Sequence, residues 1–188
     1  MARAHFVKRA RKDNPVAKAG ESYWWWKFMQ GGRGGPKRFS KEQPRQSQLT
    51  QSAFFGAVYA MQEAVEDFNT ATADMSELET FRDEVGGMAQ TIGDECQSSL
   101  DNMPDGLREG PSGEMLTERV SAMEEMVSTI EGVDCDEEDW ETDAKDELEN
   151  SGELFSDEDL SNLADEKMHE HLSQQYDELV AAVEYDGE

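Results

Sequence analysis

The sequence is poor in cysteine and histidine, and it has no long apolar run. Its two cysteines, Cys96 and Cys135, form no CxxC pair, so no disulfide framework is indicated and a reducing compartment fits. No segment approaches 18 consecutive apolar residues, so no membrane-spanning helix is predicted. The basic start MARAHFVKRARK has no apolar run behind it, so a secretory signal is not predicted either.

Residues for catalysis are equally sparse. The three histidines, at positions 5, 169 and 171, accompany no G-x-S-x-G elbow, and the segment GGRGGP lacks the GK[ST] ending of a phosphate-binding loop. Glu166 and His169 form a single ExxH, whereas a di-iron site needs two. The acidic run near Asp134 has Lys145 where a calcium loop needs a bidentate glutamate. We therefore expect no enzyme activity, no cofactor and no metal.

Positive charge is nearly absent after residue 50. Residues 1–50 hold 12 of the 17 Lys and Arg but only three acids, so this part is +9 and the remainder is −35. Such asymmetry is typical of interaction proteins, and the two parts should attract each other. With 36% hydrophobic and 32% charged residues, narrow apolar contacts between helices are more plausible than a large core.

The basic part divides into two predicted segments. Residues 1–20 are turn-rich and predict a mobile basic arm. Residues 21–48 predict a β-hairpin: SYWWWKFM suits a strand, GGRGGP a loop of about six residues, and KRFSK a returning strand. Because two strands are marginally stable in water, a third strand from residues 4–8, or docking on a helix, would be needed.

The acidic part predicts helices, so the fold class is mainly α. Apolar residues at spacings of 3 and 4 mark helices over 54–68, 74–103 and 116–130 within an acidic helical assembly, 49–133. Asp74 and Glu77 predict a capping box, and MPDGLREGPSG separates the last two helices, which favours an antiparallel helical hairpin or bundle with coiled-coil-like packing. The predicted apolar face of the long middle helix comprises Leu78, Phe81, Val85, Met88, Ile92, Cys96, Leu100 and Met103.

The last part of the chain is predicted to be a linker followed by one more helix. Residues 134–153 are so acidic that they predict a linker or weak helix. Residues 154–188 predict a C-terminal helix and tail, with Ser156 as N-cap, Asp159 three residues later, and Phe155 packing on Leu160.

The tryptophan-rich strand predicts a contact surface. Side chains alternate along a strand, so Trp24, Trp26 and Phe28 share one face, while Trp25 and Lys27 share the other with Tyr23. A hairpin covered on one side can bury only one set. Aromatics among cations suit single-stranded nucleic acid, although internal packing and a protein partner remain alternatives. The predicted nucleic-acid-binding residues are Arg3, Lys8, Arg9, Arg11, Lys12, Trp25, Lys27, Arg33, Lys37, Arg38 and Lys41.

The acidic helices support a different hypothesis. Carboxylates on a rigid rod, Glu124 and Glu125 among them, could mimic nucleic acid and occupy a basic groove on a host protein. A virion structural component is a third possibility. In the first hypothesis the acidic helices act as a spacer or self-association module, through which the chain could form a homo-oligomer.

Two stretches also resemble a family of small bacteriophage-encoded proteins. These are ARAHFVKRARKDNPVAKAGESYWWWKF with KRFSK and PRQSQLTQSAF, and later SLDNMPDGLREGPSGEMLTERVSAME. The resemblance covers somewhat under half of the chain and implies a phage or prophage origin, with a location in the bacterial host cytoplasm or the virion. The family has no established activity, so the resemblance assigns no functional residue. The turn GGRGGP is longer here than in the family.

Overall fold

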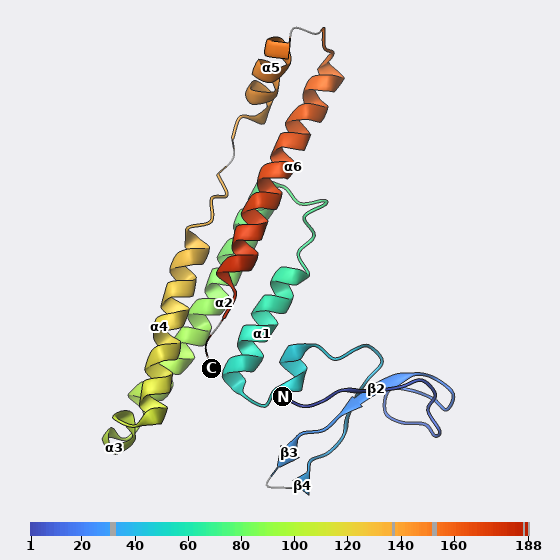
Figure 1. The fold of residues 1–188 in the computed structure, drawn as a ribbon, viewed down its shortest axis with the longest axis vertical. Coiled ribbons are helices and arrows are strands. Elements are labelled where there is room, and N and C mark those ends of the chain that lie inside the picture. The colour runs from blue at the N-terminus through green and yellow to red at the C-terminus, as the bar shows by residue number, and fades with distance from the viewer. Residues whose placement is uncertain (31–32, 137, 152–153, 186, 188) are drawn as a thin grey trace. The chain divides into compact units, whose positions relative to one another are not determined.

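The structure is a computed structural model that describes the chain except residues 31–32, 137, 152–153, 186 and 188 and the side chains of residues 30 and 33. The chain forms two compact units (Figure 1): an N-terminal unit, Met1–Glu63, and a helical unit, Ala64–Glu188. It is mainly α-helical with an N-terminal antiparallel sheet, which confirms the predicted fold class.

The N-terminal unit is built on a three-stranded antiparallel sheet in the order β1-β2-β5. Its strands are β1 (His5–Val7), β2 (Tyr23–Trp26) and β5 (Arg38–Ser40). The third strand expected from residues 4–8 is therefore present. Two further short strands, β3 (Met29–Gln30) and β4 (Arg33–Gly34), pair with each other in antiparallel fashion. Part of the predicted tip loop therefore belongs to a second, two-stranded sheet.

Residues 1–20, predicted as a mobile arm, contain strand β1 and a loop that hydrogen bonds close. After β1 the chain closes into a loop: the Ala10 N–H donates to the Glu21 carbonyl at 2.8 Å, and the Gly20 N–H donates to the Ala10 carbonyl at 2.9 Å. Asn14 Oδ1 accepts from two backbone N–H groups further along the loop. Gly20 has φ +97°, a conformation that glycine adopts without a steric penalty. Local side-chain-to-backbone bonds thus order a segment without regular secondary structure.

A short helical segment covers one face of the sheet. The 3₁₀ helix η1 (Gln46–Leu49) lies beside Trp26, whose indole N–H donates to the Gln48 carbonyl at 3.1 Å. Helix α1 (Ala53–Glu66) follows, and the Ser47 hydroxyl bonds the Glu63 carboxylate at 2.6 Å. These bonds hold η1 against the sheet on one side and α1 on the other.

The helical unit contains the predicted antiparallel helical hairpin. Helices α2 (Met75–Asp101) and α4 (Pro111–Glu131) lie side by side in opposite directions (Figure 1), with the short α3 (Asp105–Arg108) in the turn between them. Asp74 caps α2, and the predicted capping box with Glu77 is present. None of the described helices is both long and apolar enough to cross a bilayer.

The contact between α2 and α4 departs from the predicted face at one point. Met88, expected in the apolar face, is 41% exposed, whereas its neighbour Ala89 is fully buried. The buried positions Val85, Ala89, Ile92 and Cys96 keep spacings of 4, 3 and 4, so Met88 lies beside this row rather than in it. Gly93 allows the two helices to approach closely, because a Cβ at that position would come within 3.2 Å of the Met123 Cβ. Buried residues of α2 and α4 include Leu78, Val85, Ala89, Ile92, Cys96, Met123, Met126 and Ile130.

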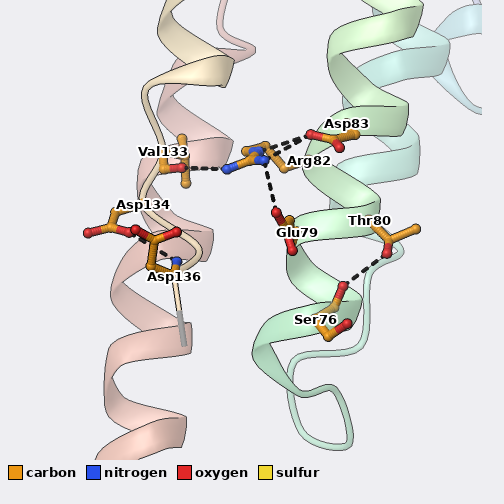
Figure 2. A network of polar contacts seen from close by, with 8 residues as sticks. All are labelled: Ser76, Glu79, Thr80, Arg82, Asp83, Val133, Asp134 and Asp136. Atoms are coloured by element: carbon orange, nitrogen blue, oxygen red, sulfur yellow. Dashed lines mark hydrogen bonds and ion pairs between the residues drawn. The ribbon is translucent and has the colours of Figure 1, made fainter. Parts of the chain in front are cut away.

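The end of α4 is fixed by polar contacts (Figure 2). The Arg82 guanidinium of α2 donates to the Val133 carbonyl at 3.1 Å and pairs with Asp83 Oδ1 at 3.0 Å. The next residue of the chain, Asp134, is fixed by α6: its backbone N–H donates a hydrogen bond to the side-chain oxygen of the buried Gln175 at 3.1 Å. Burial raises the pKa of the neighbouring Cys135 thiol despite the nearby guanidinium, so this cysteine is kept protonated.

Residues 134–153 are predicted as a linker or weak helix, and their described part contains a helix. They include α5 (Trp140–Ser151), a full helix that packs on α6 (Asp157–Ala182). Ala144 is fully buried, and Lys167 Nζ of α6 pairs with Glu147 of α5 at 2.6 Å. Tertiary contacts therefore supply the stability that the acidic sequence lacks by itself. The start of α6 is as predicted, with Ser156 as N-cap and a capping box to Asp159.

Candidate nucleic-acid interface

The strand β2 divides its aromatic residues between two faces of the sheet. Trp26 is 4% exposed and Phe28, just beyond the strand, is 9% exposed, whereas Trp25 is only half-buried. Trp24, on the same face as Trp26, is also half-buried, so the covering helical segment buries only the Trp26 end of that face. Trp24 and Trp25 are therefore the two tryptophans of β2 that a ligand could reach, one on each face.

Trp25 is the centre of a short stack. The exposed His5 of β1 lies parallel to its ring, with 4.5 Å between centroids and 16° between planes. On the β5 side, Lys37 Nζ lies over the Trp25 ring at 4.3 Å from its centroid, a cation–π contact. An imidazole, an indole and an ammonium group from three segments of the chain thus meet at one place.

Two more rings extend this surface. Phe39 of β5 is the register partner of Trp25, and Tyr23 lies 6.0 Å from Phe39 between centroids. Both are half-buried. We name the set His5, Tyr23, Trp25, Phe39 and Lys37 the Trp25 patch. On the opposite face Trp24 is 5.0 Å from Phe6, which is 55% exposed.

A surface groove of about 560 Å³ adjoins the Trp25 patch and shares His5 with it. We name it the His5 groove. Arg3 and Lys27 supply its positive charge, and Phe28 supplies an aromatic surface. Its other wall is the segment that leads into α1. The residues that line it are Met1, Ala2, Arg3, His5, Lys27, Phe28, Met29, Thr50, Gln51 and Ser52, none of them acidic.

The structure brings only some of the predicted basic residues together. Arg3 and Lys27 meet at the His5 groove, and Lys37 lies on Trp25. The Arg38 guanidinium stacks over the Phe28 ring at 5.0 Å. Lys8, Arg9, Arg11 and Lys12 are exposed in the closed loop after β1, and they are not among the described residues that line the groove. The side chain of Arg33 lies outside the described part of the chain.

Lys41 is already partly neutralised. Its ammonium pairs with Glu21 at 3.2 Å. The pKa of Glu21 is lowered, first by the backbone N–H of Lys18 and then by Lys41, so the carboxylate stays charged beside it. An exposed pair of this kind is weak, but it makes Lys41 a poorer phosphate ligand than Lys37.

His5 is the site residue that the sequence interpretation missed. The strand expected at residues 4–8 and the alternation rule together place position 5 on a definite face. The missing information was register: only the observed pairing of His5 with Trp25 shows which face it shares.

The acidic candidates lie elsewhere. Glu124 and Glu125 are both exposed on α4 in the helical unit. Within the described residues, no three His, Cys, Asp or Glu side chains gather as a metal site.

No family model, curated protein or solved structure matches this chain.

Proposed function

We propose that this is a non-enzymatic interaction protein whose Trp25 patch binds single-stranded nucleic acid. The observation that supports this most is the stack of His5, Trp25 and Lys37 on a half-exposed sheet face. Rings that carry adjacent cations offer both interactions that a single strand needs, because bases stack on aromatic faces and phosphates bind ammonium groups.

The geometry suggests how a base would reach the tryptophan. Lys37 is exposed, and its contact with the Trp25 ring is a single cation–π interaction of about 0.5–1 kcal/mol at such a site. A phosphate would draw the ammonium away from the ring. The part of the Trp25 ring that Lys37 leaves would then accept a base, while His5 stays stacked on the ring.

The protein partner is a weaker hypothesis for this surface. Hot spots in protein interfaces also use tryptophan and arginine. However, the Trp25 patch combines four aromatic rings with a lysine and contains no carboxylate, which favours an anionic planar ligand.

The test is a titration of a fluorescein-labelled oligothymidylate with the intact chain at low and moderate salt, followed by anisotropy. We expect binding that weakens as salt rises, with a slope of about −0.7 per phosphate contact. Absence of binding at low salt, where electrostatic attraction is strongest, would overturn the proposal.

A second candidate function is supported by the helical unit. Its described surface carries adjacent exposed carboxylates at Glu124 and Glu125, as an acidic inhibitor or nucleic-acid mimic would need. In the first proposal these helices serve as a spacer or self-association module.

A further inference from the structure

We propose that the His5 groove is a subsite for one nucleotide of the bound strand, next to the base held at Trp25. This inference rests on the proposed function of the Trp25 patch. His5 connects the two places, because it stacks on Trp25 and also lines the groove. A base inside the groove that stacks on His5 would continue the same stack.

The chemistry of the groove fits a nucleotide. Arg3 and Lys27 provide two cations for a phosphate, and no described lining residue carries a negative charge to oppose them. His5 provides aromatic surface for the base, and the largely buried Phe28 contributes to the apolar lining. The volume of about 560 Å³ lies inside the range of about 300–1,000 Å³ that is usual for small-ligand sites.

The remaining wall can hydrogen-bond a base edge or a sugar. It consists of Thr50, Gln51 and Ser52, just before α1. Two of these have structural partners: Thr50 Oγ1 accepts from the Ser52 N–H at 3.2 Å, and Ser52 Oγ accepts from the Phe55 N–H at 3.4 Å. Gln51 is exposed, and its amide carries both donors and an acceptor.

Backbone hydrogen bonds fix the chain segments on both sides of the groove. The Ala2 N–H donates to the Leu49 carbonyl at 2.6 Å, which ties the start of the chain to the segment before α1. The Gly35 N–H donates to the Phe28 carbonyl at 2.8 Å, which fixes the other side. The subsite is therefore largely formed before a ligand arrives, which reduces the entropy lost on binding.

The first test uses a matched pair of glutamines. Gln51→Glu places a carboxylate in the groove, whereas Gln46→Glu places the same charge on the exposed face of η1, outside the groove. Binding of fluorescein-labelled dT8 at low salt should weaken about three- to tenfold for Gln51→Glu, from repulsion of a nearby phosphate. The Gln46→Glu variant should stay within about twofold of the wild type.

The second test separates a nucleotide from any other anion. His5→Ala should weaken dT8 binding more than binding of an octaglutamate peptide, because only bases stack on the ring. Equal weakening of both ligands would overturn the assignment of a nucleotide. Thermal unfolding followed by circular dichroism should show that Gln51→Glu and Gln46→Glu are equally stable.

The outcomes distinguish this inference from the function on which it rests. If the wild type does not bind dT8 at low salt, both the Trp25 patch and the groove are refuted. If the wild type binds, but Gln51→Glu and Gln46→Glu are indistinguishable, the groove is refuted and the Trp25 patch stands. If Gln51→Glu alone weakens binding, and His5→Ala is selective for dT8, the subsite is supported.

Discussion

The imidazole of His5 lies parallel to the indole of Trp25, 4.5 Å away between ring centroids. The two residues are twenty positions apart in the sequence, and the antiparallel register of β1 and β2 makes them direct partners. The surroundings of Trp25 thus depend on a strand formed by the very start of the chain. Loss of β1 should therefore disturb the Trp25 patch even if β2 and β5 remain paired.

The first prediction concerns Trp25. Trp25→Ala should reduce affinity for a single-stranded oligonucleotide by about 1–3 kcal/mol, the usual cost of losing one base–aromatic stack. Trp24→Ala is the matched control, because Trp24 lies on the opposite face against Phe6. Anisotropy titration measures both. If Trp24→Ala has the larger effect, the ligand uses the other face of the sheet.

The second prediction concerns salt. Log affinity should fall less steeply with log salt for Lys37→Ala. The slope should become less negative by about 0.7, because one phosphate contact is lost. Lys41→Ala should change the slope less, since Glu21 already holds that ammonium at 3.2 Å. If both substitutions change the slope equally, the oligonucleotide responds only to the total charge of the N-terminal unit and not to individual lysines. Arg38→Ala should fall between them, because the guanidinium is stacked over Phe28.

Much of the fold followed from local pattern. Spacings of 3 and 4 located the helices, and Asp74 and Ser156 marked two helix starts through capping chemistry that needs only neighbours in sequence. What could not be predicted depended on distant partners. Helix α5 is stabilised by α6, Met88 lies beside the buried row of α2 that passes through Ala89, and His5 became part of the site through strand register.

The third prediction concerns the contact between α2 and α4. Ile92 is 6% exposed in α2, so Ile92→Asp buries an unpaired charge and should lower the free energy of unfolding by about 3–5 kcal/mol. Met88→Asp, at a position that the sequence pattern also assigned to the apolar face, should cost much less because Met88 is 41% exposed. Thermal unfolding followed by circular dichroism compares them. Equal losses would place Met88 inside the helix contact after all.

The fourth prediction concerns pH at the start of α6. Bonds from the Ser156 backbone N–H and hydroxyl lower the pKa of Asp159, so the folded state prefers the carboxylate. Its stabilising contribution is complete above the unfolded pKa of about 3.9 and disappears as pH falls through the lower folded value. The advantage of the wild type over Asp159→Asn in unfolding temperature should therefore vanish in acid. An advantage that is independent of pH would show that the carboxylate charge is not what caps the helix.

The last prediction separates the two candidate functions. If the helical unit is only a spacer, neutralising Glu124 and Glu125 together to Gln should leave oligonucleotide affinity within about twofold, because the neutralised carboxylates lie outside the Trp25 patch. If the chain is instead an acidic mimic, reversing both residues to Lys should abolish binding to the basic host protein that it inhibits. Trp25→Ala should then leave that binding unchanged. Pull-down from a bacterial lysate with the wild type, the double Lys variant and Trp25→Ala gives opposite patterns for the two functions. A partner protein retained by Trp25→Ala and lost by the double Lys variant would indicate nucleic-acid mimicry, rather than nucleic-acid binding, as the function of this chain.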